Sequence, residues 1–182
     1  MKATGIVRRI DDLGRVVIPK EIRRTLRIKE GDPLEIFTDR EGEIILKKYS
    51  PIGELGNFAK EYAEALAAAS GHGICITDRD QIIAAAGGIR KDYIGKNISR
   101  QLENLIHERD QLLVNQDERS YVRITGEEKE TGLSQVICPI LCEGDAIGAV
   151  VILGKDEKSH MDETERILAK CAAGFLGRQM EQ

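Results

Sequence analysis

Basic side chains that can bind phosphate are concentrated at the start of the chain. Residues 1–29 contain nine lysines and arginines against three acidic side chains, a net charge of +6. The planar guanidinium of arginine can bind a phosphate, or the O6/N7 edge of guanine, through two parallel hydrogen bonds, which lysine cannot imitate. We therefore expect this segment to contact double-stranded DNA. The candidate contact residues are Lys2, Arg8, Arg9, Arg15, Lys20, Arg23 and Arg24.

The net charge of the whole chain, −4, hides this concentration. Residues 1–50 carry 12 basic and 9 acidic side chains, a net charge of +3, whereas residues 51–182 carry 15 and 22, a net charge of −7. This division predicts a basic binding segment followed by an acidic domain with a different role.

A short helix, expected over residues 20–28 after Pro19, places part of the basic charge on one face. Ile22 and Leu26 fall on one side of the helical wheel, and the basic residues of the helix fall on the other. Taken alone, a charged helix face is more commonly a solvated surface. The arginines beside the preceding turn favour a binding surface instead.

The turn at residues 11–14 lies between two groups of arginines. If the strand before it is regular, Arg8 and Arg9 point to opposite faces, so only one of them shares a surface with Arg15. Asp11 and Asp12 would repel phosphate if they faced it. We assign these two carboxylates to the turn itself or to orienting nearby arginines, and turn formation is the preferred role.

The first fifty residues have the pattern of a small ββαββ domain. Strands are expected over residues 4–10 and 16–18, a helix over 20–28, and strands over 34–38 and 44–49. So few large apolar side chains cannot easily complete a core without disulfides or a metal ion. We therefore expect this domain to be an obligate dimer.

Residues 4–19, with the sequence TGIVRRIDDLGRVVIP, resemble the opening of AbrB-type transition-state regulators. The resemblance continues through residues 21–26, 34–36 and 45–49. It implies a swapped-hairpin β-barrel formed by two interleaved chains. It also implies a DNA-binding surface formed by Arg8, Arg15, Arg23 and Arg24.

Beyond residue 50 the sequence predicts a connecting helix over 51–70 and one α+β domain over 71–182. Its expected elements are strands over 74–76 and 82–86, a helix over 97–109, a strand over 121–125, a mobile loop over 126–132, strands over 136–141 and 146–153, and a last helix. That helix is expected to begin at Ser159, with Asp162 completing a capping box. Its apolar stripe, interpreted as a core face and as a candidate bundle surface, contains Ile167, Leu168, Cys171, Ala172, Phe175, Leu176 and Met180.

The chain as a whole resembles sporulation regulators in which an AbrB-like head precedes a GAF-type sensor domain. In the second domain the resemblance rests on residues 77–80, 144–152 and 172–176. It implies activation of some sporulation genes and repression of others in the forespore, and a tetramer in which paired GAF domains join two dimeric heads. It also implies a pocket, bordered by residues 87–97, for an unidentified small molecule. The expected fold class is α+β, with a swapped-hairpin barrel before a GAF-like sensor domain.

The four cysteines leave a redox alternative open. Cys75, Cys138, Cys142 and Cys171 lack CxxC spacing and are interpreted as buried thiols. If the first three lay close together, the second domain could instead be a thiol redox sensor or a GAF-type methionine sulfoxide reductase.

The remaining motifs favour a non-enzyme. His72, His107 and His160 show no ligand spacing, so neither a metal ion nor another cofactor is expected. The sequence has no phosphate-binding glycine loop and no nucleophile motif, so we expect no catalysis.

A toxin-neutralising antitoxin with a protein partner is the other alternative, because related swapped-hairpin heads occur in that class. Antitoxins usually follow the head with a short disordered tail, whereas residues 71–182 have the pattern of a folded domain. The sequence shows neither a signal pattern nor an apolar run of membrane-spanning length. We therefore expect a cytoplasmic protein without a membrane partner.

Overall fold

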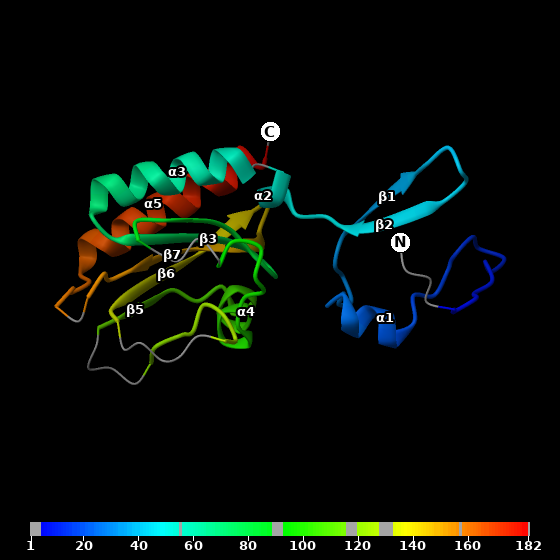
Figure 1. Cartoon of the computed structure of the whole chain (residues 1–182), viewed down its shortest axis with the longest axis horizontal. Helices are drawn as coiled ribbons and strands as arrows, with labels where there is room; N and C mark the ends of the chain where they lie inside the picture. The colour runs from blue at the N-terminus through cyan, green and yellow to red at the C-terminus, as the bar shows by residue number, and fades with distance from the viewer. Residues whose placement is uncertain are drawn as a thin grey trace. The chain divides into compact units, whose positions relative to one another are not determined.

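The computed structural model describes residues 5–54, 56–88, 93–115, 120–127, 133–156 and 158–181. The chain divides between Tyr49 and Ser50 into two compact units, which contain the elements labelled in Figure 1. None of the helices in the described ranges is long and apolar enough to cross a membrane. Lys2 and most of the expected loop over 126–132 lie outside the described residues.

The first unit contains one helix and one strand pair. The helix α1 spans Lys20–Thr25, and the strands β1 (Leu34–Thr38) and β2 (Ile44–Lys48) pair antiparallel. Within a single chain the described residues 5–18 form a turn without a strand ladder, so the strands expected over 4–10 and 16–18 are not paired there. A strand needs a neighbouring backbone to pair with, and the remainder of this unit does not supply one to these segments.

Helix α1 ends three residues earlier than the sequence predicts. Arg27 adopts the left-handed conformation with φ 54°, which no helix can continue. The backbone then closes the helix end, because the N–H of Ile28 bonds the carbonyl of Arg23 at 2.7 Å. Leu26, expected on the apolar side of the helix, is its C-cap and is 55% exposed.

The second unit is a five-stranded antiparallel sheet with helices on both faces (Figure 1). The strand order is β4 (Ile82–Ala86), β3 (Gly73–Asp78), β7 (Asp145–Leu153), β6 (Gln135–Cys142) and β5 (Leu112–Val114). The helices α3 (Gly56–Ser70) and α5 (Glu163–Gln179) cover one face, and α4 (Arg100–Glu108) covers the other.

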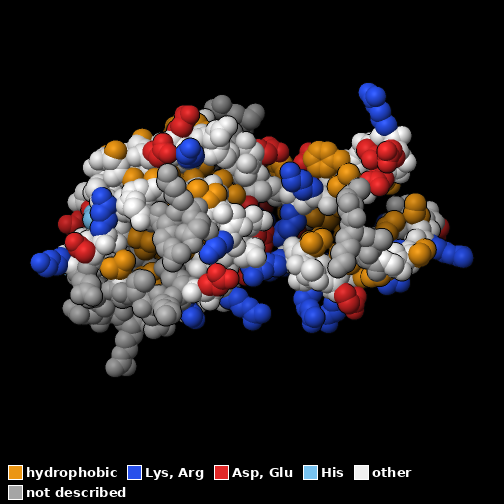
Figure 2. All heavy atoms as spheres, viewed as in Figure 1, with side chains coloured by type: hydrophobic (Ala, Val, Ile, Leu, Met, Phe, Trp, Pro, Cys, Tyr) orange, Lys and Arg blue, Asp and Glu red, His pale blue; other side chains and the backbone are white. Residues whose placement is uncertain are grey.

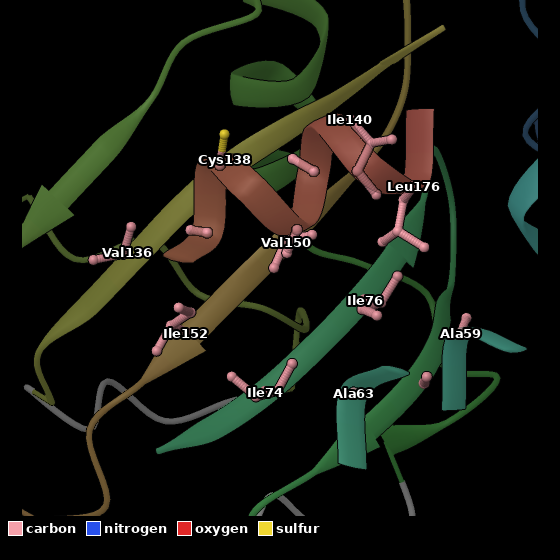
Figure 3. Packing of buried hydrophobic residues seen from close by; sticks show 14 of the residues in the cluster. Ala59, Ala63, Ile74, Ile76, Val136, Cys138, Ile140, Val150, Ile152 and Leu176 are labelled. Carbon is pink, nitrogen blue, oxygen red and sulfur yellow. The ribbon is translucent and has the colours of Figure 1, made fainter. Parts of the chain in front are cut away.

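Alternate residues of the central strands fill two separate cores. Ile74, Val150 and Val136 point toward α3 and α5, and Figure 3 shows this packing. Their neighbours Cys75 and Val151 point toward α4 instead. Because both faces are covered, β3 is a continuous buried run, and this explains why its sequence shows no polar alternation.

The junction between the units is anchored to the second one. Ser50 Oγ donates a hydrogen bond to Asp78 Oδ2 at 2.8 Å and accepts one from the N–H of Gly53. This cap starts the short helix α2 (Pro51–Glu54), which places Ile52, 1% exposed, in the core. The helices α2 and α3, which replace the single helix expected over 51–70, therefore pack as part of the second unit.

Two side-chain amides replace backbone pairing at the edge of this unit. The expected strand over 121–125 is wrong, and only Thr125 forms an isolated bridge, with Ile98. Instead Gln135 accepts a hydrogen bond from the N–H of Val122 at 2.7 Å and donates one to its carbonyl at 3.0 Å. Asn115, after the unpredicted strand β5, holds the N–H and the carbonyl of Met161 in the same way.

The last helix is capped by a residue other than the expected one. Asp162 is the N-cap, and its capping box is completed by Glu165, whose carboxylate accepts the N–H of Asp162 at 2.9 Å. Ser159, the expected start, instead donates to Asp156 Oδ1 in the preceding turn. Glu165 also lies 3.4 Å from His72 Nε2, a contact between distant segments that sequence spacing could not reveal.

Two glycines on α5 provide a test of this packing. A Cβ on Gly177 would lie 2.0 Å from the carbonyl oxygen of Leu141, whereas a Cβ on Gly174 would meet nothing within 4 Å. We expect Gly177→Ala to lower the free energy of unfolding by about 1–3 kcal/mol through overpacking. Gly174→Ala should raise it by about 0.5–1 kcal/mol because alanine favours the helix. Equal denaturation midpoints for the two variants would contradict the helix-on-sheet contact.

Candidate nucleic-acid interface

A tight turn in the first unit is organised by one carboxylate. Asp11 Oδ1 accepts the N–H groups of Leu13 at 3.0 Å and of Arg15 at 2.8 Å. The N–H of Asp11 bonds the carbonyl of Arg15, and Gly14 supplies the positive φ of 76° that the chain reversal needs. Asp11 therefore forms the turn, which is the role preferred for it from the sequence.

The same carboxylate also holds an arginine side chain. Arg15 Nε donates to Asp11 Oδ2 at 2.8 Å, while the Arg15 side chain remains 69% exposed. The hydrogen bond from the backbone N–H of Arg15 and the contact with its guanidinium lower the pKa of Asp11 below that of an ordinary aspartate. Of the two roles considered for this aspartate, turn formation and arginine orientation, the structure shows both.

The other candidate basic residues in the described ranges are all exposed. Lys20, Arg23 and Arg24 lie on α1, and Arg8 and Arg9 lie in the irregular segment before the turn. Figure 2 shows lysine and arginine side chains projecting from the first unit, with apolar side chains exposed between them. These residues can reach an anion without displacing any part of the described chain.

Apolar side chains of the first unit are exposed to an unusual degree. Seven large ones are more than half exposed, in addition to Leu26: Val7, Ile10, Leu13, Val16, Val17, Ile36 and Ile44. So many exposed large apolar side chains on so small a unit are typical of a surface that contacts another protein. Besides its exposed basic residues, the first unit therefore exposes apolar side chains that another chain could cover.

A second apolar surface lies on the helices α3 and α5. The ring of Phe175 lies 5.9 Å from that of Phe58 and 5.3 Å from that of Tyr62, and Phe175 is 40% exposed. The stripe expected as a core face is only partly correct. Ala172 and Leu176 are buried as expected, whereas Ile167, Cys171 and Phe175 are exposed. The other buried residues of α5 are Ala169, Ala173 and Gly177.

The cysteines do not form the cluster that the redox alternative requires. Cys75 belongs to the core beneath α4 and Cys138 to the core beneath α5, so the sheet lies between them. Burial raises the pKa of the Cys138 thiol, and burial together with nearby carboxylates, first that of Glu181, raises that of Cys142. The interpretation of all four as buried is wrong for Cys142, which is half-buried, and for Cys171, which is exposed.

Comparison with known proteins decides the family. Residues 54–181 match the family described as stage V sporulation protein T C-terminal, transcription factor. The whole chain is 59% identical to stage V sporulation protein T of Bacillus subtilis (strain 168), covering 100% of both chains. This chain belongs to the stage V sporulation protein T family.

The two units of this family member also have separate relatives. Residues 7–54 match the MazE antitoxin family, and 28% of the chain is 69% identical to 52% of the transition state regulatory protein AbrB of the same Bacillus strain. The GAF domain of the nutrient sensor CodY from Clostridium difficile has a TM-score of 0.53 at 15% identity, covering 66% of this chain and 83% of that one. The fold class is therefore an AbrB-type first unit followed by a GAF-like second unit.

The carboxyl of Asp11 offers a direct test of the turn. Because its pKa is lowered in the folded protein, the contribution of its ionised form to stability is complete above the ordinary aspartate range and is lost as the pH falls through the lowered value. We expect an NMR titration of Asp11 to show a midpoint below the ordinary value. Arg15→Ala should raise this midpoint only partway, because the backbone N–H remains, and Arg40→Ala should leave it unchanged. A midpoint at or above the ordinary value would contradict the contact.

Proposed function

We propose that this protein is a sequence-specific DNA-binding transcription regulator of sporulation genes that activates some and represses others. The full-length identity to stage V sporulation protein T carries this proposal. The exposed basic residues around an ordered turn and along α1 provide the chemistry that duplex DNA requires. Arg8, Arg15, Arg23 and Arg24 bind DNA, supported by Lys2, Arg9 and Lys20.

Two chains form each DNA-binding head in this proposal. The exposed apolar side chains of the first unit become buried between the copies, and the segments on either side of the turn pair as strands of an interleaved barrel. Burial of apolar surface contributes about 25 cal/mol per Å², so covering this many side chains favours an obligate dimer. Two-fold symmetry then presents every basic residue twice.

The second unit couples two such heads into a tetramer. The aromatic surface of α3 and α5 fits a bundle with the same helices of another copy, because it is apolar, exposed and continuous across both helices. Linked heads bind neighbouring DNA segments more tightly through effective concentration, without any new contact. Residues 1–50 then form the head, and residues 71–182 form a domain that pairs heads and takes up a small-molecule signal.

The alternatives are less well supported. An antitoxin role has the family match of residues 7–54 in its favour, but the folded second unit matches a transcription factor family instead. Catalysis by thiols is opposed by the separation of Cys75 from Cys138 on opposite faces of the sheet. We therefore propose a cytoplasmic regulator that acts in the forespore and is not an enzyme.

DNA binding across a salt series tests the function. We expect affinity for duplex DNA to fall steeply with salt, because several phosphates are neutralised, and Arg15→Ala to bind about tenfold more weakly. Arg40→Ala is the matched control, because it removes the same charge from the exposed turn between β1 and β2. No binding at low salt would remove the proposed function, and equal losses in both variants would remove the role of Arg15.

The coupling role predicts a variant that keeps the head and loses the tetramer. Phe175→Asp places a charge among the exposed rings, so we expect a dimer by light scattering. It should bind one DNA segment as the parent does, and a duplex with two segments more weakly. Ile94→Asp, at a similarly exposed position of the second unit, is the control. A tetrameric Phe175→Asp variant would place the interface elsewhere.

A further inference from the structure

The contact between Asp11 and Arg15 leaves the far end of the guanidinium free. Asp11 takes the Nε–H of Arg15, and the Arg15 side chain has no other partner in the part of the chain that the structure describes. The two Nη groups therefore project from a side chain that is 69% exposed. Together they carry the parallel N–H groups with which arginine reads O6 and N7 of guanine.

The carboxylate that holds this arginine is itself fixed. Its Oδ1 accepts two backbone N–H groups of the turn, at 3.0 and 2.8 Å. Because the two oxygens of a carboxylate are rigidly joined, these bonds also fix the position of Oδ2 and the direction from which Nε approaches it. Arg15 thus loses part of its rotamer freedom before any ligand arrives, which lowers the entropy lost on binding.

A carboxylate beside a DNA-binding arginine has a second effect, on binding that ignores sequence. Affinity for phosphate depends on net positive charge, and Asp11 cancels one charge beside Arg15. A base contact depends instead on the direction of the N–H groups, which the pair improves. The charge effect changes the affinity for every duplex alike, whereas the orientation effect changes the ratio of specific to non-specific affinity.

We propose that Asp11 is a specificity-determining residue that positions Arg15 to read a guanine and weakens its attraction to phosphate. The role rests on the DNA-binding function proposed above. Asp11 touches Arg15 and the turn backbone, and it acts on DNA through them.

Asp12 provides a matched control for this role. It carries the same charge one residue along the chain, is exposed, and makes no side-chain hydrogen bond or ion pair within the described residues. Asp11→Asn and Asp12→Asn remove the same charge, but only the first removes the ion pair with Arg15. Asparagine at position 11 keeps an oxygen for the turn N–H groups and favours turns, so Asp11→Asn should keep the turn and lose only the stability that the ionised carboxylate contributes. Asp12→Asn should retain the melting temperature of the parent.

The experiment compares two duplexes with the full-length protein. One is a guanine-containing duplex selected by the parent from a pool with a randomised core, and the other is an alternating dA·dT duplex. Both variants should bind the dA·dT duplex more tightly than the parent, because neither carries the negative charge of the parent at its position. Asp11→Asn alone should lower the ratio of the two affinities by about tenfold, within the range that one bidentate arginine–guanine contact discriminates.

Arg15→Lys gives a second and independent measurement. Lysine keeps the charge but cannot donate two parallel hydrogen bonds, so the ratio of the affinities for the two duplexes should fall here too. Adding Asp11→Asn to Arg15→Lys should lower this ratio no further. Equal ratios for Asp11→Asn and Asp12→Asn, or a further fall in the double variant, would overturn the role of Asp11 alone. A parent that binds neither duplex at low salt would overturn the proposed function and this role with it.

Discussion

The first unit has more apolar side chains than it can bury by itself, and the proposed dimeric head follows from this constraint. Val7 and Val17 are 86% and 72% exposed on either side of the turn that carries Arg15. A single chain offers these segments neither a core nor a neighbouring strand. The proposed completion by a second copy would place two basic turns on one body.

The second unit obeys the opposite condition, because its sheet is covered on both faces. This arrangement separates Cys75 from Cys138. The faces of α3 and α5 that point away from the sheet are not required for its core. Phe175 lies there with two other aromatic rings. A complete core and a spare apolar surface suit a domain whose task is to join other parts of an assembly.

Sequence reasoning predicted what depends on local chemistry and on strong apolar patterns. The turn at Asp11, the pair β1–β2 and the hairpin β6–β7 follow from residues close together in the chain. The errors lie where a distant partner decides. Residues 121–125 look like a strand but are held by the side chain of Gln135, and Ile167 looks like a core residue but faces outward. The sequence allows the pairing of Asp11 with Arg15 to be predicted, because the two residues are only four positions apart. It does not reveal that Nε, and not the end of the guanidinium, makes the contact.

The amide of Gln135 holds the segment at Val122 through atoms of the backbone alone. Every residue except proline offers the same N–H and carbonyl, so the clamp does not depend on which side chain stands at position 122. A substitution at position 122 can therefore leave both hydrogen bonds in place, provided that proline is avoided and Gln135 is kept. The place of this backbone segment at the sheet edge therefore depends on the amide of one distant residue and not on the hydrogen-bonding capacity of its own side chain at position 122.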